Sequence, residues 1–157
     1  MLQTIEKLSR QGRYEDALQS ALRMLPSQMQ HPQLLFKVAS LYDTLGQEQQ
    51  AIPFYQAAIK HHLGGKDLRD AYLGLGSIYR ALGRYQESLE TFDEGLSRFP
   101  EANDIRMFRA MTLYNLGYAK QAVSQLLLLM TENDTSQEIN RYKKVIAHYC
   151  DDLDRIE

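Results

Sequence analysis

Residues 69–100, RDAYLGLGSIYRALGRYQESLETFDEGLSRFP, decide the fold of this chain. Apolar and small residues recur at helical spacing before Gly83 and again after it, and Ser88 follows that glycine five positions later. Glycine suits the junction because a residue that leaves a helix often takes the left-handed conformation, which glycine enters without a Cβ penalty. The stretch therefore predicts a helix, a tight turn and a second helix.

The same arrangement recurs along the chain. The turn glycines Gly12, Gly46, Gly83 and Gly117 lie 34, 37 and 34 residues apart. Each is followed by a small residue, namely Ala17, Ala51, Ser88 or Ala122. The longer middle spacing coincides with His62–Lys66 (HLGGK), which lengthens a connection between units. Self-similarity at a fixed period of this length indicates a helical repeat protein.

The units resemble the tetratricopeptide repeat family. In residues 69–100 the family's packing positions hold Tyr72, Leu75, Gly76, Tyr79, Ser88, Phe92, Gly95 and Pro100. The fourth unit departs from the family pattern at Arg106 and Arg109, where apolar residues are usual. The resemblance implies an all-α fold, an α-α superhelix of about four helix-turn-helix repeats closed by a C-terminal capping helix.

Repeat boundaries follow from the same frame. We expect a single domain over residues 1–157, with a shortened first repeat at 1–31 and further repeats at 32–66, 67–102 and 103–134. Pro53 is expected in the first turn of a second helix, where proline costs least. Tyr14 and Tyr85 recur just after the turn glycines, Tyr42 and Tyr79 recur at one helix position, and all four are predicted to be core residues.

The pattern of residues 135–157, the tail, predicts one long helix. Thr135 and Glu138 form a capping-box pattern, and an apolar face continues from Ile139 to Ile156. A stack of repeats ends in an apolar surface, so the helix is predicted to cap the last repeat. The alternative is that this face belongs to a second copy of the chain and makes a homodimer.

Composition excludes several classes of function. Lys and Arg number 18 against 20 Asp and Glu, a net charge of −2, which argues against nucleic-acid binding. The longest apolar run, residues 126–130, is far short of the roughly 20 residues that span a bilayer. A single cysteine, Cys150, cannot form an internal disulfide and the N-terminus lacks a continuous apolar segment, so the expected location is the cytoplasm.

No constellation of residues predicts catalysis, a metal site or a cofactor. His61 and His62 are adjacent, so on a helix they point about 100° apart and cannot form a zinc-binding pair. Cys150 and the neighbouring aspartates are interpreted as an acidic helix end and not as a metal or nucleophile site. Gly74 and Gly76 fall inside a helix and read as packing glycines rather than as a phosphate loop. The chain is therefore not expected to be an enzyme.

The resemblance also implies where a partner would bind, because the first helix of each pair lines a concave groove in this family. The positions that face this groove are Phe36, Ser40, Asp43, Asp70, Leu73, Ser77, Arg80, Asp104, Met107, Met111, Tyr114 and Asn115. They predict an apolar strip, with methionines that adapt to differently shaped partners, flanked by aspartates. The expected function is a protein-protein interaction scaffold, with structural self-association as the alternative.

The resemblance further bears on the kind of partner. Family members that bind acidic chaperone tails use a clamp of Lys, Arg and Asn in the groove. Depending on the repeat chosen, the clamp positions here hold Leu2, Glu6, Lys37, Asp70 and Gly74, or Phe36, Ser40, Gly74, Asp104 and Phe108. The clamp is absent, so an apolar partner segment, which basic flanks would suit, is expected instead of an acidic tail.

Overall fold

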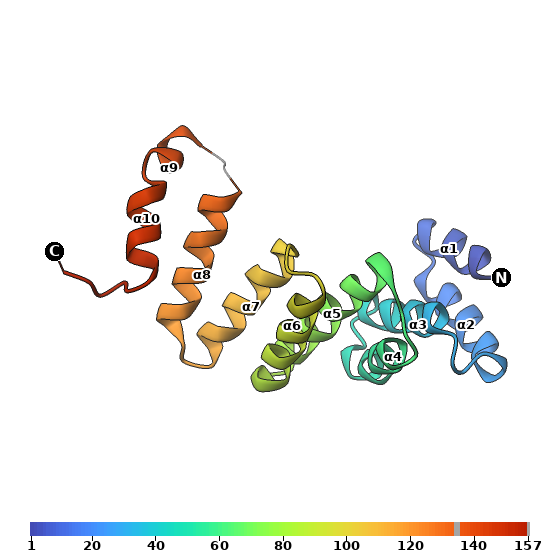
Figure 1. Cartoon of the computed structure of the whole chain (residues 1–157). Coiled ribbons are helices and arrows are strands. Elements are labelled where there is room, and N and C mark those ends of the chain that lie inside the picture. The colour runs from blue at the N-terminus through green and yellow to red at the C-terminus, as the bar shows by residue number, and fades with distance from the viewer. Residues whose placement is uncertain (134–135, 157) are drawn as a thin grey trace. The chain divides into compact units, whose positions relative to one another are not determined.

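The computed structural model describes residues 1–133 and 136–156, and every regular element in those ranges is helical (Figure 1). The chain divides into two compact units, residues 1–82 and 83–157, and each is described here by itself. The all-α fold of paired helices predicted from the sequence is confirmed.

Unit 1 contains five α-helices. These are α1 (Leu2–Arg10), α2 (Tyr14–Met24), α3 (Pro32–Thr44), α4 (Glu48–Lys60) and α5 (Gly65–Ala81), with a short 3-10 helix over Leu25–Ser27. Each α-helix packs against the next, and α3 also packs against α5. The buried cluster beneath α1, α2 and α3 is apolar and comprises Ile5, Ala17, Leu18, Ala21, Leu34, Val38 and Leu41.

Unit 2 contains α6 (Tyr85–Arg98), α7 (Asn103–Asn115), α8 (Ala119–Glu132), α9 (Gln137–Arg141) and α10 (Lys143–Cys150). Here α7 packs on both α6 and α8, while α10 packs on α8. Two small polar residues share the core, because the buried hydroxyls of Ser88 and Thr112 form a 3.0 Å hydrogen bond that joins α6 to α7. The hydroxyl pair satisfies groups that would be costly to bury alone.

The turn glycines have the backbone conformation that the sequence predicts. Gly46, for example, has φ +70°, and the turn is closed by hydrogen bonds from its N–H to the Asp43 carbonyl and from the Gln47 N–H to the Tyr42 carbonyl. At the longer connection both His62, with φ +65°, and Gly65, with φ +60°, have a left-handed backbone.

Several expectations about individual elements are wrong. The tail is not one continuous helix, because the chain leaves helical geometry at Tyr142 (φ −105°, ψ +8°) between α9 and α10. Ser136 caps α9 by accepting a 3.2 Å hydrogen bond from the Ile139 N–H, whereas the predicted cap, Thr135, lies outside the described residues. Pro53 is the sixth residue of α4, beyond its first turn.

The predicted core tyrosines differ in burial. Tyr79 is buried, Tyr42 and Tyr85 are partly buried, and Tyr14 is 36% exposed, so its assignment to the core is wrong. Tyr14 opens α2, which packs on α1 and α3, and these neighbours leave its ring uncovered.

Candidate functional site

The predicted groove residues divide between the two units, and each set is described by itself. The unit-1 face comprises Phe36, Ser40 and Asp43 on α3 with Asp70, Leu73, Ser77 and Arg80 on α5. The unit-2 face comprises Asp104, Met107, Met111, Tyr114 and Asn115 on α7. Since α3 packs on α5, the structure brings together the two halves of the unit-1 face.

On α3 the candidate residues share one side of the helix. Phe36, Ser40 and Asp43 are spaced four and then three residues apart, which places them one above the other. All three are partly buried. The Phe36 ring lies 6.1 Å, centroid to centroid, from the ring of Tyr55 at a tilt of 55°, a favourable aromatic contact.

Tyr55 belongs to α4, but its side chain connects the two helices of the unit-1 face. It is only 4% exposed, and its hydroxyl donates a 3.2 Å hydrogen bond to Oδ2 of Asp43. A Cβ atom built on Gly74 would lie 2.7 Å from that hydroxyl oxygen and 2.8 Å from the ring Cζ. Tyr55 therefore lies against the bare backbone of α5, and a side chain at position 74 would collide with it.

The electrostatics around Asp43 follow from its partial burial. Burial raises the pKa of Asp43, the Tyr55 hydrogen bond opposes this rise, and the nearby charge of Glu48 adds to it. Burial, followed by the charge of Asp43, raises the pKa of Tyr55 far above its ordinary value. The tyrosine therefore stays protonated and acts as the hydrogen-bond donor to the carboxylate.

Asp70 lies in a different environment on α5. Its Oδ2 is 2.6 Å from Nζ of Lys66 and its Oδ1 is 3.6 Å from Arg69. The negative flank predicted at Asp70 is therefore already paired with two cations of the same helix.

The unit-2 face exposes large apolar side chains. Met107 is 40% exposed and Tyr114 67% exposed, with Met111 partly buried between them. Asp104 and Asn115, at the two ends of α7, are partly buried, and Oδ1 of Asp104 accepts a hydrogen bond from the Ile105 N–H. The predicted apolar strip is thus accessible along α7.

The two arginines that interrupt the apolar pattern of α7 have ionic partners. Arg106 contacts Glu132 at 2.6 Å and Arg109 contacts Asp93 at 2.5 Å. These pairs join α7 to α8 and to α6, so cationic side chains at positions that are usually apolar are compatible with the helix packing.

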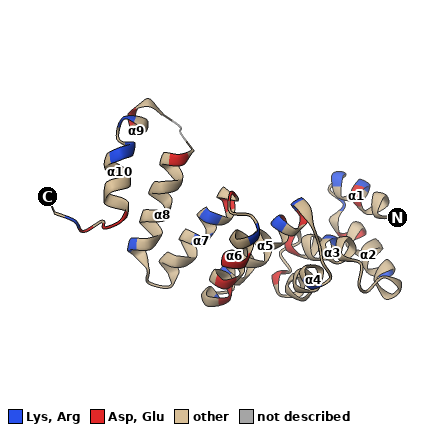
Figure 2. Ribbon diagram, in the orientation of Figure 1, with Lys and Arg blue, Asp and Glu red and all other residues tan. Residues whose placement is uncertain are grey.

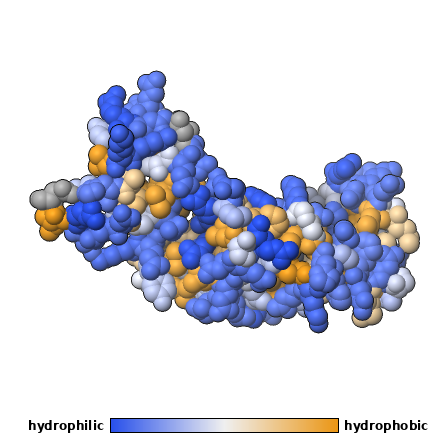
Figure 3. All heavy atoms as spheres, viewed as in Figure 1, coloured by the Kyte–Doolittle hydropathy of each residue, from blue (hydrophilic) through white to orange (hydrophobic). Residues whose placement is uncertain are grey.

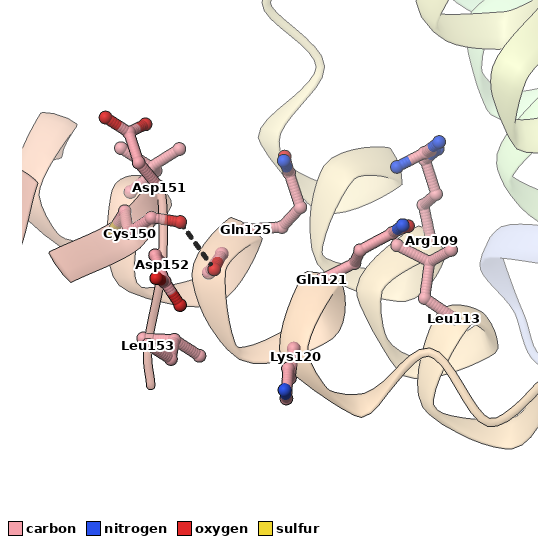
Figure 4. Close-up of a pocket in the computed structure, with 11 residues that line it drawn as sticks. Arg109, Leu113, Lys120, Gln121, Gln125, Cys150, Asp151, Asp152 and Leu153 are labelled. Carbon is pink, nitrogen blue, oxygen red and sulfur yellow. Dashed lines mark hydrogen bonds between the residues drawn. The ribbon is translucent and has the colours of Figure 1, made fainter. Parts of the chain in front are cut away.

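A cleft of about 490 Å³ lies in unit 2 between α7, α8 and the segment that follows α10 (Figure 4). Arg109, Gln121 and Gln125 line one side and Cys150 to Leu153 the other, and Ser124 donates a 2.8 Å hydrogen bond to the Cys150 carbonyl. Burial raises the pKa of the Cys150 thiol, which keeps it protonated and unreactive. No group of three metal-ligating side chains is present in the part of the chain that the structure describes.

Charge and hydropathy are mixed over the surface. Acidic and basic residues are interspersed on most helices, but α8 carries charge only near its two ends, at Lys120 and Glu132 (Figure 2). Apolar surface forms separate patches in a mostly hydrophilic face (Figure 3). Within residues 1–133 and 136–156, no helix combines the length and hydrophobicity needed to span a membrane.

Sequence reasoning did not find the role of Tyr55. Gly74 was recognised as a packing glycine, and the structure shows that the group packed against it is the Tyr55 ring. The sequence feature that points to this contact is a glycine inside a helix, at a position where the family places clamp residues. The residue that packs on Gly74 cannot be read from that feature, because it depends on how α4 crosses α5.

Antiparallel helix pairs joined by left-handed glycine turns define an α-helical repeat protein. The family model described as tetratrico peptide repeat matches residues 32–153. The chain belongs to the tetratricopeptide repeat family.

Two known proteins extend this comparison. Residues of the chain align with YrrB, a repeat protein with an unusual peptide-binding site known from its crystal structure, at a TM-score of 0.73 and 18% identity, covering 96% of this chain and 76% of that one. The protein O-mannosyl-transferase TMTC1 of Homo sapiens is 26% identical over 116 residues, which is 74% of this chain. The chain spans only 13% of the length of that human relative.

Proposed function

We propose that the chain is a non-catalytic scaffold that binds another protein or peptide. The binding surface lies on the exposed side of the first helix of each repeat, namely α3, α5 and α7. The observation that carries this proposal is the apolar surface of α7, where Met107 and Tyr114 are exposed although the opposite side of the helix is well packed. Exposed methionine and aromatic side chains are typical of surfaces that bind partners.

The unit-1 face supports the same function with a different chemistry. Phe36 and Leu73 are partly exposed apolar residues of the same face as Asp43, whose carboxylate is bonded to the Tyr55 hydroxyl. The family and the fold that this chain shares with YrrB, which has a peptide-binding site, agree with binding of an extended or helical segment. The expected partner segment is apolar and basic-flanked, and is not an acidic chaperone tail. The free, protonated Cys150 thiol suits a reducing compartment such as the cytoplasm.

An affinity pull-down from host lysate tests this function. Tyr114→Glu places a charge on the unit-2 face at little cost to folding because the side chain is largely exposed, and Ser40→Glu does the same on the unit-1 face. Met29→Glu, at an exposed position outside both faces, is the matched control. We expect a specific partner to be retained by the wild type and the control and lost from at least one face variant. Equal retention by all four proteins would contradict the proposal.

Self-association is the second candidate function. Val123 and Met130 on α8 are exposed, as are Tyr142 between α9 and α10 and Val145 on α10, so a second copy could cover apolar surface in unit 2. Light scattering at low micromolar concentration distinguishes the two functions. A mass near 18.2 kDa excludes the dimer, whereas a doubled mass that Val123→Lys reduces to the monomer would favour it.

A further inference from the structure

We propose that Asp43 makes the unit-1 face selective for a partner segment that carries an arginine side chain, whose guanidinium binds the Asp43 carboxylate. This inference rests on the proposed function, because it names the chemistry of the segment that the face binds. It is carried by the geometry of one partly buried carboxylate and the Tyr55 hydroxyl bonded to it.

The carboxylate of Asp43 has one oxygen in use and one available. Oδ2 accepts the hydrogen bond of the Tyr55 hydroxyl. Within the described ranges Oδ1 has no hydrogen-bond partner, and it is not among the enclosed polar atoms, so it is open to solvent. The Tyr55 bond fixes the orientation of the carboxylate and leaves the second oxygen for a ligand.

Asp43 differs from four ion-paired aspartates of the fold in lacking a cation within salt-bridge distance. Asp16, Asp70, Asp93 and Asp154 are paired with Arg13, Lys66, Arg109 and Lys120, respectively. In the described part of the chain no Lys, Arg or His lies within 4.0 Å of Asp43, although Lys37 and Arg80 belong to the helices of the same face. The neighbouring charge felt by Asp43 is that of Glu48, which adds negative potential. A partner that brings a cation complements this charge.

The partial burial of the carboxylate decides which cation fits best. Asp43 is partly buried, so a cation that binds it gives up part of its own hydration shell. Guanidinium is planar, weakly hydrated and stacks on aromatic faces, whereas the lysine ammonium is compact and strongly hydrated. The arrangement therefore favours arginine over lysine.

Panning a random dodecapeptide phage library on the full chain tests the inference. We expect arginine next to aliphatic residues among the peptides enriched on the wild type. For a representative peptide, Asp43→Asn is expected to weaken binding about tenfold or more, as does replacing its arginine by citrulline, a neutral isostere. Replacement by lysine should weaken binding less. Glu15→Gln, which removes an exposed carboxylate on α2, is the matched control and should change nothing.

The outcomes separate this inference from the proposed function. Enriched peptides that lack arginine, or that bind Asp43→Asn and wild type equally yet are lost from Ser40→Glu, would overturn the arginine selectivity and leave peptide binding intact. Failure to enrich any peptide that is sensitive to Ser40→Glu or Tyr114→Glu would overturn the proposed function and the inference with it. Asp43→Arg that binds a peptide with glutamate in place of arginine would support the direct contact.

Discussion

Asp43 is held where its negative charge is unfavourable to folding. Burial raises the pKa of Asp43, so the folded chain holds the proton more tightly than the unfolded chain does. Any stability from this group is present below its ordinary pKa of 3.8 and is lost as the pH rises through the raised value in the folded state. At neutral pH the ionised side chain therefore lowers the free energy of unfolding.

This reasoning predicts the effect of Asp43→Asn on stability. The asparagine carbonyl can still accept the Tyr55 hydrogen bond, while the charge is gone. We expect the Tm of the variant at pH 7 to equal or exceed that of the wild type by a few degrees at most. The difference should vanish at a pH below 3.8, where the wild-type carboxyl is protonated. Thermal unfolding followed by circular dichroism at both pH values checks this, and a lower Tm at pH 7 alone would contradict it.

At the scale of elements, the contact between α4 and α5 depends on Gly74. Alanine is about 1 kcal/mol better than glycine in a helix interior. Its Cβ would, however, lie 2.7–2.8 Å from the hydroxyl and Cζ of Tyr55, which packing and the Asp43 bond hold in place. We therefore expect Gly74→Ala to destabilise the chain by roughly 1–3 kcal/mol, the usual range for overpacking.

Denaturant unfolding of a double-mutant cycle checks this prediction. Tyr55→Leu shortens the side chain that meets position 74, so the double variant Tyr55→Leu, Gly74→Ala should lose less than the sum of the two single losses. Additive losses would show that the cost of Gly74→Ala does not come from Tyr55.

Helix pairs were predictable from the sequence because their boundaries are local. Gly46 and Gly117, for instance, take the left-handed conformation that a turn requires. The break at Tyr142 was not predictable, because the apolar periodicity of the tail continues across it without a glycine or proline. The wrong assignment of Tyr14 to the core has another cause. Tyr14 occupies a position that recurs in another repeat, but the helices that pack around it differ between the repeats.

The candidate site was predictable in part for the same reason. The common face of Phe36, Ser40 and Asp43 follows from their spacing on one helix. The pairing of Asp70 with Lys66 does not, because Lys66 is predicted in a connection between units, whereas α5 begins at Gly65 and puts the two residues in an i, i+4 relation. The contribution of Tyr55 required the crossing of α4 over α3 and α5. A periodicity argument treats Tyr55 as a core residue and cannot show that its hydroxyl reaches Asp43 on the unit-1 face.

For the whole molecule, repeat architecture implies stability that varies along the chain. Each helix of such a protein contacts mainly its neighbours, so segments can open without global unfolding. The described residues of α9 are all at least partly exposed, and α10 buries only Cys150 and packs chiefly on α8. In contrast α5 buries seven residues, Leu68, Ala71, Tyr72, Leu75, Gly76, Ile78 and Tyr79. Burial is therefore extensive in α5 of unit 1 and slight in α9 and α10 of unit 2.

Hydrogen exchange measured by mass spectrometry tests this gradient. We expect α9 and α10 to exchange first, and α5 in unit 1 and α7 in unit 2 to exchange among the slowest. Ser124→Ala removes the hydrogen bond to the Cys150 carbonyl and should speed exchange in α10 severalfold without changing α5. Ser97→Ala is the matched control, because that hydroxyl bonds a carbonyl within its own helix. A single exchange rate over both units would contradict the gradient, since it would mean that the tail opens only when the repeats unfold.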